Sequence, residues 1–216
     1  MSIPLTLITF SGIAMALLAF VGTPRGQREA TLIARQLALP PNATVADVGA
    51  GSGKLTVELA RRLGPSGQIF ATEIEPDKVA AIARRARRSG LDNVRALQAT
   101  ADRSGLPPAC CDGALMRGVY HHLTAPDATL DDLFAALRPG GRLLVIDFRP
   151  TFWLKPWMPK GLPPDRTGHG IDPETVEAEA RAAGFVVEQR LEDWPSPVLH
   201  RFYALVLRRP PANGQR

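Results

Sequence analysis

The sequence has only two cysteines in 216 residues, and they are adjacent at positions 110 and 111. Neighbouring cysteines are a poor pair for an ordinary structural disulfide, and they lack partners at the spacing of a zinc site. The chain also has no low-complexity tract and no internal repeat, which excludes fibrous and solenoid architectures. A disulfide-stabilised or zinc-stabilised fold is therefore not expected, and the cysteine usage suits a reducing compartment.

Charge is missing altogether from residues 3–22, IPLTLITFSGIAMALLAFVG. As a helix, this run would cover about 30 Å, the thickness of a bilayer core. We therefore expect residues 1–24 to form an apolar helix that anchors the chain in a membrane. Because the nearest basic residues, Arg25 and Arg28, follow the run, the positive-inside tendency predicts a domain on the cytoplasmic side of the inner membrane. An export signal, and an apolar helix packed on a soluble cytoplasmic protein, remain open alternatives.

After residue 24 the sequence alternates between apolar runs typical of buried strands and amphipathic helices. Such alternation predicts a doubly wound α/β fold, in which helices cover both faces of a mostly parallel seven-stranded sheet. Two final strand-like runs with a short connection predict an antiparallel hairpin at the sheet edge. The expected strands are residues 44–49, 68–74, 93–98, 112–119, 142–148, 185–194 and 200–209, and the expected helices are residues 24–39, 53–64, 76–90, 125–141 and 172–184.

We expect one domain over residues 25–209, followed by a disordered tail over residues 210–216. Residues 150–170, rich in proline, glycine and tryptophan, interrupt the alternation and resemble a lid or a substrate-facing loop.

The stretch VADVGAGSGK, residues 45–54, places three glycines after the first strand of this domain. A dinucleotide fingerprint would need a glycine where the chain has Lys54, and the P-loop pattern is absent as well. The glycine turn therefore indicates a nucleotide-type ligand without naming it.

Four segments in order, DVGAGSG, ATEIEP, DGALMRGVYHHL and LRPGGRLLVIDF, resemble the motifs of class I S-adenosylmethionine-dependent methyltransferases. The resemblance covers about residues 27 to 209 and is closest to bacterial small-molecule enzymes, broadly similar to the C-methyltransferases of quinone biosynthesis. It implies S-adenosylmethionine as the cofactor and methyl transfer as the activity.

The resemblance also implies how the cofactor is held. Asp47 would help to hold the methionyl amino group, directly or through a water molecule. Glu73 would accept both ribose hydroxyls, which a carboxylate can do with its two oxygens. Asp102 falls where an acid can meet the adenine amino group, although its loop departs from the usual glycine-aspartate pattern. The remaining expected cofactor-binding residues are Gly49, Ala50, Gly51, Ser52, Gly53 and Ile74.

The acceptor side offers Tyr120, His121 and His122 as candidate catalytic residues, since histidine titrates near neutral pH. Structural or pocket-lining roles are the alternative, because histidines recur at this turn in family members with unlike acceptors. Arg117 would hold an anionic group of the substrate or pair with a nearby acid. Asp147 is a further candidate at the end of the fifth strand.

No metal is expected, because Met116 and Arg117 occupy the place of a metal-binding acid in the metal-dependent relatives.

The leading hypothesis is methyl transfer to a small acceptor, which the apolar N-terminus suggests is lipophilic. Two alternatives remain. One is an RNA or protein methyltransferase that uses the arginine-rich helix, although the N/D-P-P-Y motif of base methylation is absent and nucleic acid is not the expected partner. The other is a non-catalytic, cofactor-binding membrane protein. The sequence does not indicate an oligomeric state.

Overall fold

The computed structural model describes residues 25–150, 170–195 and 202–212, which form an α/β domain around a seven-stranded sheet of strand order β3-β2-β1-β4-β5-β7-β6. Only β7 runs antiparallel to its neighbours, β5 and β6. The strands are β1 (Thr44–Val48), β2 (Gln68–Glu73), β3 (Val94–Gln98), β4 (Cys111–Arg117), β5 (Leu137–Phe148), β6 (Val186–Trp194) and β7 (Phe202–Arg208). The helices are α2 (Arg25–Gln36), α3 (Lys54–Leu63), α4 (Pro76–Arg88), the short 3-10 helix η1 (Tyr120–His122), α5 (Pro126–Ala136) and α6 (Pro173–Ala182).

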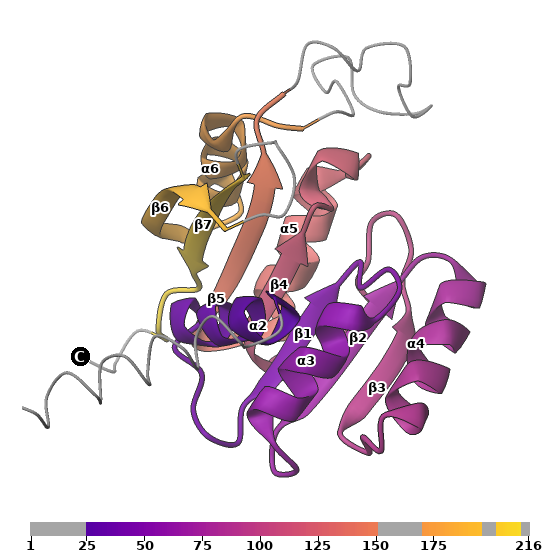
Figure 1. Ribbon diagram of the computed structural model, residues 1–216. Helices are drawn as coiled ribbons and strands as arrows, with labels where there is room; N and C mark the ends of the chain where they lie inside the picture. Colours follow the sequence, from indigo (N-terminus) through magenta and orange to yellow (C-terminus); the bar gives the residue numbers. More distant parts are fainter. Residues whose placement is uncertain (1–24, 151–169, 196–201, 213–216) are drawn as a thin grey trace, which may run out of the picture.

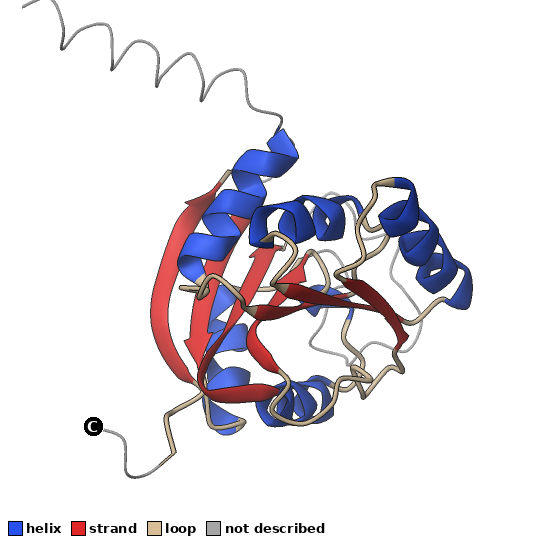
Figure 2. Ribbon diagram, turned by 90° about the horizontal axis from the view of Figure 1, so that it is seen from below, coloured by secondary structure: helices blue, strands red, loops and turns tan. Residues whose placement is uncertain are grey.

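The helices form two layers, one on each face of the sheet (Figure 1, Figure 2). Buried residues of α2, α3 and α4 pack with Val45, Leu115 and Ile146 on one face. Buried residues of α5 and α6 pack with Ala46 and Val145 on the other face. The alternation of side chains along each strand thus divides the apolar core in two, as a sheet covered on both faces requires.

The expected doubly wound sheet and its antiparallel edge hairpin are confirmed, since β6 is the outermost strand and pairs with β7. The boundary between α5 and β5 was predicted wrongly. The expected helix over residues 125–141 ends at Ala136, and β5 begins at Leu137, which pairs with Cys111. Gly141 helps to explain why the helix ends early. A Cβ at this position would lie 2.9 Å from the Arg138 carbonyl oxygen, so the backbone can pass this close to Arg138 only with glycine.

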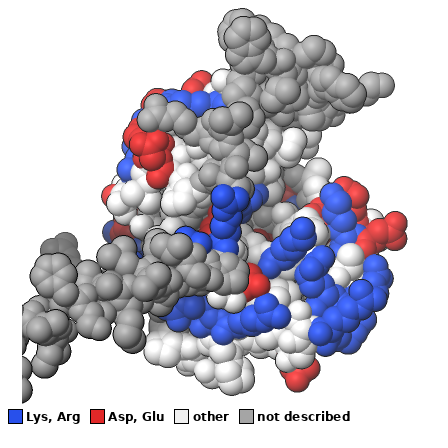
Figure 3. All heavy atoms as spheres, in the orientation of Figure 1, with Lys and Arg blue, Asp and Glu red and all other residues white. Residues whose placement is uncertain are grey.

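Basic and acidic side chains are unevenly distributed on the surface. Figure 3 shows Lys and Arg side chains gathered over α3 and α4, on the layer that also contains α2.

Several expectations fall on residues outside those described. They are the apolar helix over residues 1–24, most of the proline-rich segment 150–170, the first residues of the strand 200–209 and the end of the tail 210–216. Among the described helices, none has the length and apolarity needed to cross a membrane.

Candidate cofactor and acceptor site

The turn after β1 depends on glycine at three positions. Gly49, Gly51 and Gly53 have φ values of 68°, 56° and 70°, in the left-handed region that other residues rarely adopt. At Gly49 a Cβ would also lie 2.7 Å from the Val119 Cγ2 atom. The turn can therefore pass close to the segment after β4 and leads into α3 at Lys54.

A cavity of about 490 Å³ lies beside this turn. Its walls come from the carboxyl ends of four neighbouring parallel strands, the place where open α/β sheets bind ligands. The lining residues are Val48, Gly49, Gly51, Thr72, Glu73, Ile74, Glu75, Lys78, Ala99, Thr100, Ala101, Arg103, Ser104, Gly118, Val119, His122, Leu123 and Thr129.

Glu73, at the end of β2, is held in the wall of this cavity by two backbone amides. The N–H of Gly51 donates to Oε2 at 2.9 Å, and the N–H of Ile74 donates to Oε1 at 2.8 Å. Glu73 is only 9% exposed. These contacts fix the carboxylate beside the glycine turn, where it can accept hydrogen bonds from a ligand's hydroxyl groups.

Asp47 lies behind the turn and does not line the cavity. It is 3% exposed, and the Thr56 hydroxyl donates a hydrogen bond of 2.6 Å to its Oδ2 atom. Burial raises the pKa of Asp47 to about 6, against the opposing effects of the Thr56 hydrogen bond and the positive charge of Arg117. A buried carboxylate with so high a pKa is a candidate partner for a ligand's positive charge.

Other expected cofactor-binding residues lie outside the cavity wall. Ala50 closes the turn, since its N–H donates to the Thr72 carbonyl and its own carbonyl accepts from the Gly53 N–H. The Ser52 carbonyl accepts a hydrogen bond from Arg85 Nε at 2.7 Å. Asp102 is exposed and accepts a 2.8 Å hydrogen bond from the Thr100 hydroxyl, so its loop lines the cavity through other residues.

The two adjacent histidines of η1 have different surroundings. His122 lines the cavity, whereas His121 is buried and its Nδ1 atom lies 2.8 Å from Asp147 Oδ1. Since a carboxylate only accepts hydrogen bonds, Nδ1 of His121 is the donor. The His121 N–H also donates to Asp147 Oδ2 at 3.2 Å. Asp147 therefore fixes both the ring and the backbone of His121.

Tyr120 and Arg117 are also bound to other elements of the fold. The buried Tyr120 donates its hydroxyl hydrogen to Glu179 of α6 over 2.6 Å, and Arg117 Nε donates to Glu29 of α2 over 2.6 Å. Neither residue lines the cavity. For Arg117 the structure thus favours the pairing with an acid over contact with a substrate.

Thr72 is a site residue that the sequence analysis missed. It lines the cavity, and its buried hydroxyl oxygen has no hydrogen-bond partner among the described residues. Its position directly before Glu73 at a strand end is the signal that points to it. The cavity thus combines an unsatisfied hydroxyl, a carboxylate and a glycine turn with apolar residues such as Val119. This combination suits a nucleoside, which has a polar sugar and a flat base. Among the described residues, no group of three potential metal ligands occurs.

Comparison with known proteins agrees with this geometry. A family model described as a methyltransferase domain matches residues 39–186, which is more than half of the chain. The chain therefore belongs to the class I S-adenosylmethionine-dependent methyltransferases.

Among individual proteins, the ubiquinone/menaquinone biosynthesis C-methyltransferase UbiE of Vibrio vulnificus is 32% identical over 114 residues, 52% of this chain and 44% of that protein. The matched part thus spans less than half the length of this curated relative. A SAM-dependent methyltransferase from Aquifex aeolicus has a similar structure, with a TM-score of 0.68 and 22% identity over 90% of this chain and 97% of that chain. The 1,6-didemethyltoxoflavin-N1-methyltransferase of Burkholderia thailandensis, with bound 1,6-didemethyltoxoflavin and S-adenosylhomocysteine, has a TM-score of 0.63 and 23% identity over 97% of this chain and 93% of that chain. These two structures support the fold.

Proposed function

We propose that this protein transfers a methyl group from S-adenosylmethionine to a small, lipophilic acceptor. The observation that carries the proposal is the cavity at the carboxyl ends of the strands, in which the Glu73 carboxylate lies beside a glycine turn. The family model and the four ordered motifs support the same activity.

The cofactor would be held mainly by residues of β1, β2 and the turn between β1 and α3. Glu73 would accept hydrogen bonds from the two ribose hydroxyls, and the absence of a Cβ at Gly51 would let the backbone approach the ligand. Asp47 offers its negative charge to the methionyl ammonium group. The loop that contains Asp102 would cover the adenine, and Ile74 would contribute to the same cavity wall.

When bound, S-adenosylmethionine supplies a methyl group that its sulfonium has already activated. The protein must then align the acceptor and exclude water. His122, which lines the cavity, is the residue we assign to removing a proton from the acceptor. His121 is a positioning residue that Asp147 holds in one orientation, with the two imidazole centroids 3.9 Å apart. We assign Tyr120 to the support of this turn through α6.

The class of acceptor rests on two observations. The UbiE relative is named as a C-methyltransferase of ubiquinone and menaquinone biosynthesis, which suggests a phenol-like or quinol-like acceptor here. The uncharged run at residues 3–22 suggests membrane association at the cytoplasmic side of the inner membrane, where such an acceptor would dissolve. We retain residues 25–209 as the proposed catalytic domain.

Titration calorimetry with S-adenosylhomocysteine tests the cofactor assignment. We expect clear binding by the wild type and a loss of about 30-fold to 100-fold in Glu73→Ala, since two charge-assisted hydrogen bonds are removed. Glu58→Ala, an acidic residue of α3 outside the cavity, is the matched control. Absence of binding by folded wild-type protein would disprove the cofactor assignment, and unchanged affinity in Glu73→Ala would disprove the role of Glu73.

A cofactor-consumption screen against quinols, phenols, thiols and amines tests the acceptor class. We expect turnover with the quinols or phenols. Tight binding of S-adenosylhomocysteine without turnover of any acceptor would instead support a non-catalytic, cofactor-binding protein.

A further inference from the structure

The two helical layers of the domain have opposite charge. Helices α2, α3 and α4 contain eleven lysine and arginine residues and three acidic residues. Helices α5 and α6, on the other face of the sheet, contain six acidic residues and one arginine. We call the first layer, α2 with α3 and α4, the basic face. The net positive charge of the basic face exceeds the net charge of +5 of the whole chain. Positive charge is therefore concentrated on this face and not spread evenly over the molecule.

The C-terminal half of α4 is the most basic part of this face. Arg84, Arg87 and Arg88 are all exposed, and the structure gives them no acidic partner among the residues it describes. Their spacing of three and four residues places them on one side of the helix. Arg85 differs, because its Nε atom donates to the Ser52 carbonyl of the glycine turn. Three unpaired guanidinium groups on one helix side form a surface that attracts anions.

We propose that the basic face docks on an anionic lipid bilayer. Two observations favour a bilayer over a nucleic acid. First, α2, α3 and α4 contain no Phe, Tyr or Trp, the side chains on which single-stranded nucleic acids stack. Second, the uncharged run of residues 3–22 precedes α2 in the sequence, and stable membrane attachment commonly combines an apolar segment with a basic surface.

Docking through the basic face would place the cofactor cavity near the bilayer surface. Lys78, in the first turns of α4, lines the cofactor cavity, and Arg88 ends the same helix. At about 1.5 Å per residue the length of α4 is about 20 Å, so contact through α4 keeps the cavity within that distance of the bilayer surface. The acidic layer of α5 and α6 then faces the aqueous side, away from the anionic headgroups.

Vesicle binding of the full chain tests this proposal. The variant Arg84→Gln/Arg87→Gln/Arg88→Gln removes three charges and retains Arg85, which supports the glycine turn. Binding is measured on vesicles of phosphatidylcholine alone and on vesicles that also contain phosphatidylglycerol. The ratio of the two partition coefficients isolates the electrostatic contribution from that of the apolar run, which is present in both measurements. We expect this ratio to fall by roughly a hundred-fold, because each basic residue near an anionic surface contributes about five-fold.

The control is a variant with the same change in net charge on the opposite face, Ala128→Glu/Ala178→Glu/Ala182→Glu. All three alanines are exposed on α5 or α6. We expect the control to retain most of the preference for anionic vesicles. Thermal unfolding and S-adenosylhomocysteine binding are measured for both variants, so that a defect in folding or in the cofactor site is separated from a defect in docking.

Three results would overturn the proposal. An equal loss of vesicle preference in both variants would show that net charge controls binding. No loss in either variant would show that the apolar run alone controls binding. The third result is RNA binding with a steep dependence on salt that the arginine variant loses, while its vesicle preference is unchanged. That result would assign the basic face to nucleic acid.

Discussion

Replacing Asp47 with asparagine should stabilise the protein at neutral pH and weaken cofactor binding. Asp47 is buried, and burial raises its pKa to about 6. At neutral pH the folded protein therefore holds a negative charge where the surroundings favour the neutral acid. Asparagine has nearly the same shape, and its carbonyl oxygen can still accept the hydrogen bond from the Thr56 hydroxyl.

The size of the effect follows from the two pKa values. The difference between the ordinary pKa of 3.8 and the folded value of about 6 corresponds to roughly 3 kcal/mol, at about 1.4 kcal/mol per pKa unit. Because the folded pKa is raised, the stabilising contribution of protonated Asp47 is fully present below pH 3.8 and is lost as the pH rises through about 6. The asparagine variant has no such titration. Its advantage should therefore be up to about 3 kcal/mol above pH 7 and should shrink as the pH falls from about 6 toward 4.

Urea unfolding of wild type and Asp47→Asn across this pH range measures the difference directly. An advantage that does not change with pH, or a variant that is less stable than wild type above pH 7, would refute the reasoning. Calorimetry with S-adenosylmethionine completes the test. We expect about 10-fold to 100-fold weaker binding by the variant, since the negative charge that attracts the ammonium group, directly or through a water molecule, is lost.

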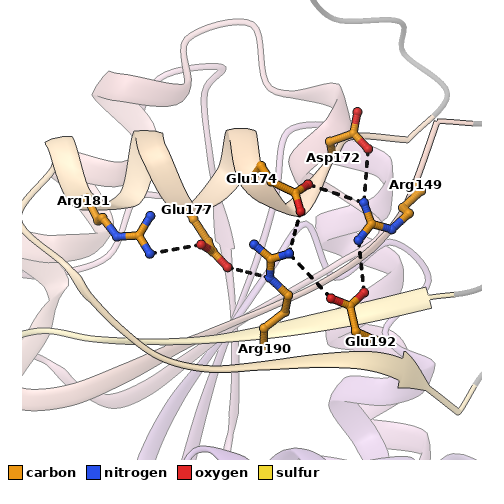
Figure 4. Close-up of polar contacts among 7 residues, drawn as sticks. All are labelled: Arg149, Asp172, Glu174, Glu177, Arg181, Arg190 and Glu192. Atoms are coloured by element: carbon orange, nitrogen blue, oxygen red, sulfur yellow. Dashed lines mark hydrogen bonds and ion pairs between the residues drawn. The ribbon is translucent and has the colours of Figure 1, made fainter.

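Four further substitutions test other parts of the site and fold. Gly51 and Gly90 both have positive φ and open space for a Cβ, so alanine at either should cost about 1 kcal/mol of stability. Only Gly51 lines the cavity, and only Gly51→Ala should weaken S-adenosylhomocysteine binding; equal effects on binding would contradict the assignment. His122→Asn should lower kcat about 100-fold or more with little change in S-adenosylhomocysteine affinity, and an unchanged kcat would exclude His122 as the base. Arg190→Ala should destabilise the fold by about 2 kcal/mol in urea unfolding, because the mostly buried Glu177 loses its 2.7 Å partner in the ionic cluster of Figure 4. A loss of stability within about 0.5 kcal/mol would show that the cluster contributes little.

The same ionic cluster shows what sequence patterns cannot provide. Arg149 follows β5, and it lies 3.4 Å from Asp172 before α6 and 3.1 Å from Glu192 in β6. The three residues are far apart in the chain, and each by itself is an ordinary exposed charge. Only the folded sheet brings the end of β5, the start of α6 and the outer strand together, so the pairing follows from tertiary structure and not from local pattern.

The sequence by itself determined the order of strands and helices and the position of the glycine turn, because both depend on local properties. Burial on a strand or helix follows the spacing of apolar residues, and a positive φ after β1 requires glycine. The end of α5 was predicted wrongly, since the pairing of Leu137 with Cys111 in the neighbouring strand overrides the local preference.

Only the tertiary structure decided the different roles of His121 and His122 in the short segment Tyr120–His122. His121 and His122 are adjacent and chemically identical in the sequence, so no pattern distinguishes them. In the short 3-10 helix η1, successive side chains point in different directions. One of them meets Asp147, which is 26 residues away in the chain, while the other lines the cavity. Asp47 is a second example, because a carboxylate acquires a pKa of about 6 only when the whole sheet and α3 remove it from water.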